Sequence, residues 1–533
     1  MNSTPSDLPG NSAAQAQPSL VCVHITLPHL IALEGGPPPA AAADAAALRT
    51  WIQSRYQFLR RTIDVRVEGD AVTVEFRREP PGREAEASAL AAQASAALDA
   101  GDPGRAARLF TRSLRLEPCR HEAWFGLAKA EGKRSDDAAA RAAALKAARL
   151  CPRQAAYVAE LADVAAGAKD AAAAERLARL ALQLDSRHPF ARHTLSWALA
   201  ASGRAEEALA ELREEARLHS NSSKPLFLLA GHLLKLGRPE EALGAFKEFL
   251  RLESQRPSLP PPLEVVPLLH YKIQMELAER TVHATASLAR SLKRRIEADF
   301  GYPVRVLAQP PANGSLYYAE DALSFGLDRH TLQYEPSLPE PARSYVIAHG
   351  LMLIQVLCEA EAAGKGTCSH MLDRLCRGHD PQLDIDAFDP KAIPLAASVL
   401  VHLLRTALEM TLLVREQALH PVLAPAQFLT FDGLQRHCYP APSEVMEAPG
   451  DDPRELRRAV LALDCVQAMQ LDALWHPATD YTGAFPATEV LPMARRLWDR
   501  FLANQPSTGP GDAYRLALDF AEVLGLGPAP SKS

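Results

Sequence analysis

The chain has 533 residues, of which 47% are hydrophobic and 23% charged, and its formal net charge is −6. This length exceeds what a single hydrophobic core organises, so several domains are expected. The composition is that of an ordinary globular protein. The slightly acidic balance argues against nucleic acid or an anionic membrane surface as a partner for the whole chain.

Three features of the sequence indicate the cellular compartment of the protein and whether it spans a membrane. No uninterrupted apolar run reaches the ~20 residues of a membrane span. The N-terminus lacks the basic start and apolar stretch of a signal peptide. Eight cysteines occur without a CxxC pair, which is typical of a reducing compartment. We therefore expect a soluble cytoplasmic protein with no membrane partner.

Residues 20–80 predict a small α/β module. A β-like run covers 20–26 and a helical stretch covers about 40–59. Two alternating segments, 63–67 and 71–76, are separated by a Gly-Asp pair that favours a hairpin turn. A module of about 60 residues is near the lower limit for an independent core. We therefore expect it to lean on the repeat that follows it.

Residues 84–254 repeat with a period of 34 residues over five units. Alanine recurs at one place of every unit, in Ala106, Ala140, Ala174, Ala208 and Ala242. Five places earlier each unit has a turn-prone or polar residue, in Gly101, Ser135, Lys169, Gly203 and Gly237. This pattern resembles the tetratricopeptide repeat (TPR), an antiparallel helix pair. The resemblance implies a stacked α-solenoid with a concave protein-binding surface.

The resemblance also implies which residues line that surface, because the first helix of each TPR unit faces the concave side. The corresponding places here hold Phe125, Lys129, Phe190, His193, Trp197, Lys224 and Phe227, with Ala159 and Asp163 in the third unit. Aromatic anchors favour an apolar peptide or partner helix in a groove. Phe125 and Lys129 stand where a carboxylate clamp has Lys and Asn, so chaperone-tail recognition is not expected. The occupant is either an external protein or the C-terminal domain of this same chain.

The remaining segments complete a mostly α organisation. Residues 1–19 and 526–533 are predicted to be loose tails, and the Pro-rich stretch 255–263 a stiff linker. Residues 264–525 predict a helical α+β domain that opens with a helix over about 265–300. Its strand-like pieces are 304–308, 322–326 and 330–334.

One stretch of this domain resembles the lead-in of gluzincin metallopeptidases of the ImmA/IrrE type. A strand at 330–334 passes through a Pro-rich turn into an apolar helix that carries His349. The family places its zinc motif, HExxH, on that helix. Gly350 stands where the resemblance would place the general base, and Leu353 replaces the second histidine. The resemblance thus implies a non-catalytic relative, and the alternative is a core helix with one histidine. Close backbone packing would explain a glycine in the middle of this helix.

Two residues of a later helix, predicted over 395–419, are weak metal candidates together with His349. They are His402 and Glu409, seven residues apart on roughly the same side of the helix. Zinc would be the cofactor if they met; otherwise none is expected. A second set of possible ligands is Cys368, His370, Cys376 and His379, whose first spacing is tighter than ordinary zinc modules use.

The sequence supports a non-catalytic interaction scaffold in which the TPR groove binds a peptide or partner helix. No catalytic residue is assigned. The alternative is a metal-dependent, peptidase-like hydrolase with an atypical site around His349. A third hypothesis is a sensor in which the C-terminal half binds a small ligand and gates the groove.

Overall fold

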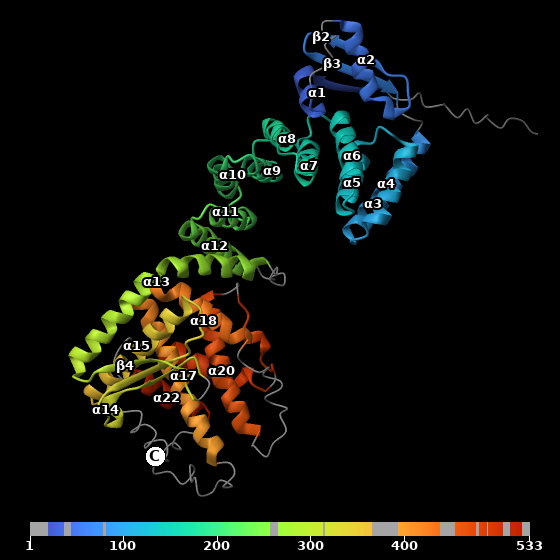
Figure 1. The fold of residues 1–533 in the computed structure, drawn as a ribbon. Helices are drawn as coiled ribbons and strands as arrows, with labels where there is room; N and C mark the ends of the chain where they lie inside the picture. The colour runs from blue at the N-terminus through green and yellow to red at the C-terminus, as the bar shows by residue number, and fades with distance from the viewer. Residues whose placement is uncertain are drawn as a thin grey trace, which may run out of the picture. The chain divides into compact units, whose positions relative to one another are not determined.

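The computed structural model describes ten segments of the chain, namely residues 20–36, 44–77, 81–255, 265–312, 315–364, 393–437, 454–475, 479–487, 489–504 and 512–524. Its internal contacts divide the chain into unit 1, Met1–His232, and unit 2, Leu233–Ser533. Figure 1 traces both units, which are described separately below. The predicted tails, the linker after Gln255 and the Cys368–His379 set lie outside the described residues.

Unit 1 begins with a three-stranded antiparallel sheet in the order β1-β3-β2. Its elements are β1 Leu20–Thr26, α1 Leu27–Glu34, α2 Ala45–Arg55, β2 Asp64–Glu68 and β3 Ala71–Arg77. The inward-facing side chains alternate along β3, where Val72, Val74 and Phe76 are buried. Gly69 turns the hairpin with a φ of +60°. The three strands, the helix (α2) and the turn that the sequence predicts for this module are confirmed.

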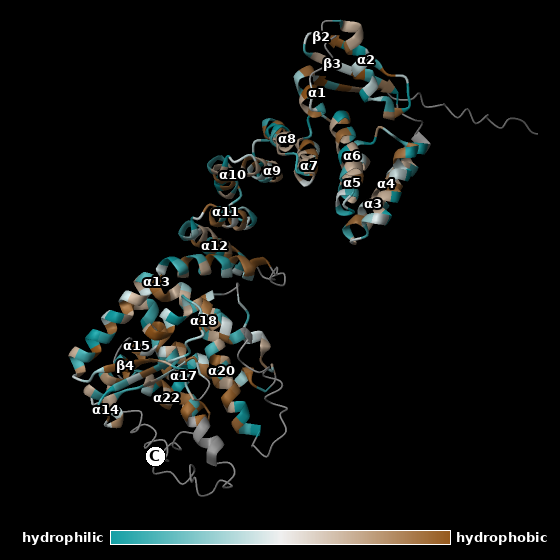
Figure 2. Cartoon of the chain, viewed as in Figure 1, coloured by the Kyte–Doolittle hydropathy of each residue, from teal (hydrophilic) through white to brown (hydrophobic). Residues whose placement is uncertain are grey.

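In unit 1 the predicted repeats form four antiparallel helix pairs within the described residues. The pairs are α3 Pro81–Asp99 with α4 Pro103–Leu116, α5 His121–Lys133 with α6 Asp137–Leu150, α7 Ala155–Gly167 with α8 Ala171–Leu184, and α9 Pro189–Ala201 with α10 Ala205–Leu218. The helices α11 Lys224–Lys235 and α12 Pro239–Ser254 occupy the fifth period. These helices carry both hydrophobic and hydrophilic residues, as Figure 2 shows. The division between the two units falls within α11.

The periodic residues have two structural roles. The five ladder alanines are all fully buried, because adjacent helices approach closely only where the side chain is small. The five turn residues all have positive φ, from +61° at Ser135 and Lys169 to +79° at Gly101. Left-handed backbone is the conformation that glycine adopts at least cost. Each repeat therefore turns from its first helix to its second through the same backbone conformation.

The N-terminal module packs mainly on the second helices of the second and third repeats. It also contacts the first repeat, as expected, through Arg61, whose guanidinium lies 3.3 Å from Glu117 at the end of α4. Its α1 contacts α6 and α8. On α6, Arg149 makes two hydrogen bonds to Glu34, of 2.6 and 2.7 Å, and donates to the carbonyl of Arg55. On α8, Arg176 Nε donates to the carbonyl of Ala32 over 3.0 Å. Polar side chains of the repeats thus satisfy the ends of the module's helices.

Unit 2 surrounds a mixed three-stranded sheet in the order β4-β6-β5. Strand β4 (Val304–Ala308) runs parallel to β6 (His330–Tyr334), and β5 (Tyr317–Glu320) runs antiparallel to β6. The main helices are α13 Val265–Phe300, α15 Ala342–Ala362, α17 Ile393–Leu419, α18 Ala424–His437, α20 Arg454–Trp475, α21 Leu491–Asn504 and α22 Asp512–Val523. Helix α15 contacts β5 and β6 on one side and α13 and α18 on others, so it lies in the core of the unit.

One strand prediction in this unit is wrong. Residues 322–325 form a short helix, α14, and the strand instead covers 317–320 as β5. The Asp321 side chain caps the helix by accepting from the amide of Ser324 over 2.7 Å. Gly326 closes the helix with a φ of +65°. An N-capping aspartate and a C-terminal glycine favour a helical turn, and this signal outweighs the β-like composition.

Helix α15 is long and apolar enough to cross a membrane by length and composition. Within its most apolar window, 67% is buried inside the structure. Its burial against β5, β6 and α13 accounts for its apolar sequence as that of a core helix. Both the mostly α fold class and the flanking α/β and α+β parts agree with the fold expected from the sequence.

Candidate functional site

The first candidate site belongs to unit 1 and consists of side chains from the first helices of four successive repeats. We call it the first-helix surface. It comprises the predicted residues Phe125 and Lys129 on α5, Asp163 on α7, Phe190, His193 and Trp197 on α9, and Lys224 and Phe227 on α11, together with Glu160 on α7. The sequence analysis missed Glu160, whose position three residues before Asp163 places both carboxylates on one side of α7.

Contacts between repeats link the rings and cations of this surface. Lys129 Nζ lies 4.5 Å from the centroid of the Phe125 ring. The Phe125 ring lies 4.8 Å from that of Tyr157 on the next first helix. Lys224 Nζ lies 5.5 Å from the centroid of Phe190, and so joins α11 to α9. Of the predicted side chains, Lys224 and Phe190 thus meet across a repeat boundary, whereas Lys129 and Phe125 meet within α5.

The apolar members of the surface differ in exposure. Phe190 is 62% exposed, the largest exposed fraction among the large hydrophobic side chains in the described ranges. Trp197 is half-buried and packs against the core of unit 1, and Ala159 is fully part of that core. Phe190 is therefore the ring most available to a ligand, whereas Trp197 also supports the fold.

The pKa values of two carboxyl groups on α7 are raised. Burial raises the pKa of Glu160 to about 7, opposed by the nearby Lys129 and reinforced by Asp163. Burial also raises the pKa of Asp163, while Lys224 lowers it. For His193, burial together with Lys224 and His232 lowers the pKa to about 4, so its imidazole is neutral near pH 7. The surface therefore holds a half-buried carboxyl, Glu160, next to an exposed one, Asp163.

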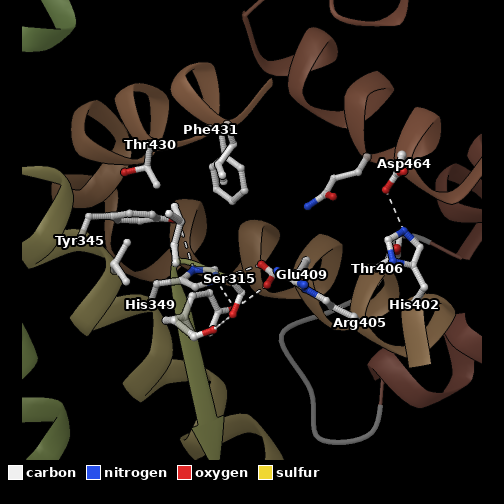
Figure 3. Close-up of a pocket in the computed structure, with 15 residues that line it drawn as sticks. Ser315, Tyr345, His349, His402, Arg405, Thr406, Glu409, Thr430, Phe431 and Asp464 are labelled. Atoms are coloured by element: carbon white, nitrogen blue, oxygen red, sulfur yellow. Dashed lines mark hydrogen bonds and ion pairs between the residues drawn. The ribbon is translucent and has the colours of Figure 1, made fainter. Parts of the chain in front are cut away.

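The second candidate site lies in unit 2, around His349 on α15. The imidazole is sandwiched between two glutamates of α17, as Figure 3 shows for Glu409. His349 Nε2 lies 2.9 Å from Glu409 Oε2, and Nδ1 lies 2.6 Å from Glu416 Oε1. The separation of the two glutamates by seven residues puts both on one side of α17. All three side chains are buried.

Two tyrosines and a glutamine complete this cluster. Tyr317 on β5 donates to Glu409 and lies 3.1 Å from His349 Nε2. Tyr345, one turn before His349, donates to Glu416 Oε2 over 3.0 Å. Gln427 on α18 donates to the same oxygen over 2.6 Å. Every oxygen of the two carboxylates thus has a donor, as buried charges require.

The cluster contains a protonated imidazole between two anions. Burial alone lowers the pKa of His349, but the charges of Glu416 and Glu409 together with their hydrogen bonds raise it to about 10. Burial raises the pKa of Glu409, whereas His349, Arg405 and Tyr317 outweigh it and hold the value at about 2. At neutral pH the imidazolium therefore balances part of the charge of the two carboxylates.

A cavity of about 250 Å³ opens beside this cluster. Its lining comes from the loop before β5 and from α15, α17, α18 and α20 (Figure 3). His402 lines the cavity but pairs with Asp464 through a 2.7 Å contact. The structure thus brings the predicted candidates Glu409 and His402 to one cavity, with only Glu409 in contact with His349.

The donor set does not fit the zinc site of a metallopeptidase. Both nitrogens of His349 face carboxylate oxygens on opposite edges of the ring. Among the residues that the structure describes, no group of three or more His, Cys, Asp or Glu side chains is arranged to hold a metal ion. At Gly350, a Cβ would lie 2.4 Å from Leu332 Cδ1 on β6. The close contact is with a side chain and not with backbone as predicted, and a side chain at position 350 requires Leu332 to move.

Comparisons with protein families agree with the geometry of unit 1. The family model of the tetratricopeptide repeat matches residues 91–155. A second model, that of anaphase-promoting complex, cyclosome, subunit 3, matches residues 168–249. The chain carries tetratricopeptide repeats. Both matched ranges lie within the segment where the 34-residue period was found.

Solved structures similar to the chain include several TPR proteins. MamA residues 41-end from Desulfovibrio magneticus RS-1 is 17% identical, with coverage of 32% of this chain and 97% of that one, and a TM-score of 0.30. PilF from Pseudomonas aeruginosa is 18% identical, with coverage of 40% and 93% and a TM-score of 0.32. YrrB, described as a TPR protein with an unusual peptide-binding site, is 16% identical, with coverage of 31% and 86% and a TM-score of 0.27. No curated protein matches the chain.

Proposed function

We propose that this chain is an interaction scaffold whose first-helix surface binds a peptide or partner helix. The observation that carries the proposal is Phe190, a large ring that is 62% exposed and has a cation, Lys224, over its face. Aromatic side chains, Phe among them, are enriched at protein interfaces relative to the rest of the surface. An aromatic side chain beside a cation is a common binding anchor. The surface would then bind its partner through complementary shape and charge, without catalysing a reaction.

We further propose that unit 2 is a non-catalytic relative of the metallopeptidases. The order of β6, a Pro-rich turn and α15 supports the relation, as does the contact of Glu409 on a later helix with His349. The filled position at Gly350 supports the loss of catalysis, because a general base must reach the reacting water. We also propose a cytoplasmic location, because the cysteines of the described segments are free thiols, as is typical of a reducing compartment.

The hydrolase alternative has a direct test. Elemental analysis of the purified full chain should find less than one zinc per molecule, and His349→Ala should leave that content unchanged. Stoichiometric zinc that is lost in His349→Ala would instead support a metal-dependent hydrolase at this site.

The scaffold proposal is tested by selecting peptides from a random display library on the full chain. Phe190→Ala is expected to weaken the selected peptides at least about tenfold, which is the effect of a moderate hot spot. Leu20→Ala is the matched control, because Leu20 is 59% exposed in unit 1 but lies on β1 of the module. Peptides that bind Phe190→Ala and the unaltered chain equally well would contradict the proposal.

A further inference from the structure

The charged residues of the first-helix surface occur in a fixed order along the repeats. Lys129 stands on α5, Glu160 and Asp163 stand on α7, and Lys224 stands on α11. Lys129, Asp163 and Lys224 are exposed, and Glu160 is half-buried. The surface thus presents an acidic centre between two cations, next to the rings of Phe125 and Phe190.

The cations of this surface act on its carboxylates, Lys129 on Glu160 and Lys224 on Asp163. Among the described residues, Lys129, Glu160, Asp163 and Lys224 form no ion pair within 4.0 Å. A bound segment with complementary charges can approach these four groups more closely than they approach one another.

We propose that the occupant of the first-helix surface is a segment with a central Lys or Arg, flanked by apolar residues and then by acidic residues. The central cation meets Glu160 and Asp163, and the flanking acids meet Lys129 and Lys224. Neighbouring first helices lie ~10 Å apart. An extended chain rises ~3.3 Å per residue, so about ten residues span α5 to α11. This inference rests on the proposed function and specifies its partner.

A dependence on pH follows from the same groups. Lys129 on α5 and Asp163 on α7 act on Glu160, Lys224 on α11 acts on Asp163, and His193 on α9 is neutral near pH 7. A bound cation favours the ionised form of Glu160, whose pKa of about 7 in the free protein then falls. Binding therefore releases protons and is tighter at pH 8 than at pH 6.

The probes are two labelled peptides of about 12 residues with identical apolar positions, long enough for the span above. In the matched peptide one Lys lies between two Glu, about three residues from one and about six from the other, as the helix spacing requires. In the reversed peptide Lys and Glu are exchanged. Fluorescence anisotropy on the full chain should give the matched peptide at least about tenfold higher affinity. In the double variant Glu160→Gln, Asp163→Asn this preference and its rise between pH 6 and pH 8 should be lost. The control Glu214→Gln on α10 should change neither.

The outcomes separate this inference from the proposed function. Equal binding of both peptides, weakened alike by Phe190→Ala, would overturn the charge pattern but keep the scaffold. The charge pattern would also be overturned, and the scaffold kept, if neither peptide bound while library-selected peptides still lost affinity in Phe190→Ala. Tighter binding of the reversed peptide would also overturn the inference. If Phe190→Ala changed the affinity of none of the peptides, the proposed function itself would be contradicted.

Discussion

Gly350 shows how one missing side chain organises unit 2. The glycine lies in the middle of α15, where helix propensity alone would favour alanine by ~1 kcal/mol. The helix crosses β6 so closely there that Leu332 occupies the place of a Cβ. A similar contact occurs in unit 1, where a Cβ at Gly126 would lie 2.2 Å from the Phe110 ring. At both places packing, not propensity, decides the residue.

Gly350→Ala is therefore expected to destabilise the protein by about 1–3 kcal/mol through overpacking. The control is Gly244→Ala on α12, where a Cβ meets nothing within 4 Å and the residue is exposed. That substitution should stabilise by up to about 1 kcal/mol. Urea unfolding of the two full-length variants measures both effects. A gain in stability for Gly350→Ala would contradict the packing explanation.

At the scale of elements, the buried cluster joins α15, α17, α18 and β5 through charge. His349 supplies the cation, and Glu409, Glu416 and the two tyrosines supply its partners. A buried ion pair adds little net stability compared with apolar residues of the same volume, but removal of one partner is costly. The cluster therefore specifies how these elements meet more than it strengthens the fold.

His349→Ala should lower the unfolding free energy of unit 2 by about 3–5 kcal/mol, because two buried carboxylates lose their cation. The pKa of His349 is raised to about 10, so its contribution is complete below about 6.5 and is lost as the pH rises through 10. The pKa of Glu409 is lowered to about 2, so its contribution is present above about 4.5 and is lost as the pH falls through 2.

Thermal unfolding from pH 6 to pH 10 measures the histidine contribution. The unaltered chain should lose stability across this range more steeply than His349→Ala. The control His283→Ala, at an exposed position of α13, should leave stability within about 0.5 kcal/mol. Parallel pH curves for the unaltered chain and His349→Ala would show that the imidazole is not protonated in the native state.

At the scale of the whole molecule, unit 1 combines the N-terminal module and the repeats in one core. Buried residues of the sheet and of the first four repeats belong to the same hydrophobic cluster. Arg149 joins the two parts, with its side chain 11% exposed against 9% for Glu34. The module thus depends on α6 and α8 for burial that about 60 residues cannot supply alone.

Arg149→Ala should accordingly loosen the module without unfolding the repeats. Glu34 would lose its bidentate partner and the carbonyl of Arg55 its donor, at a cost of about 3 kcal/mol for a buried pair. Hydrogen exchange should accelerate in α1 and β1–β3 and stay unchanged in α9 and α10. Arg141→Ala, an exposed position of the same helix, is the control. Uniform acceleration along unit 1 would indicate that the module and the repeats unfold together.

Much of this organisation could be predicted because its signals are local. The ladder alanines and the turn residues recur at a fixed period, and β3 alternates along its length. The short helix at 322–325 was missed although Asp321 and Gly326 mark its ends, because the strand-like composition was given more weight. The contact of His349 with Glu416 was missed because it joins residues 67 positions apart. Likewise, nothing local indicates that Arg149 reaches Glu34.

By itself the sequence determined the repeats, most helices, and the absence of a glutamate and a second histidine beside His349, since these depend on periodicity and on residue identity. Only the tertiary structure decided what replaces the missing chemistry, namely Leu332 against Gly350 and a buried imidazolium between two glutamates. It also decided that Glu160 joins the first-helix surface and that the module packs on α6 and α8. Such features depend on which distant side chains meet, and contacts of that kind leave no periodic signal in the chain.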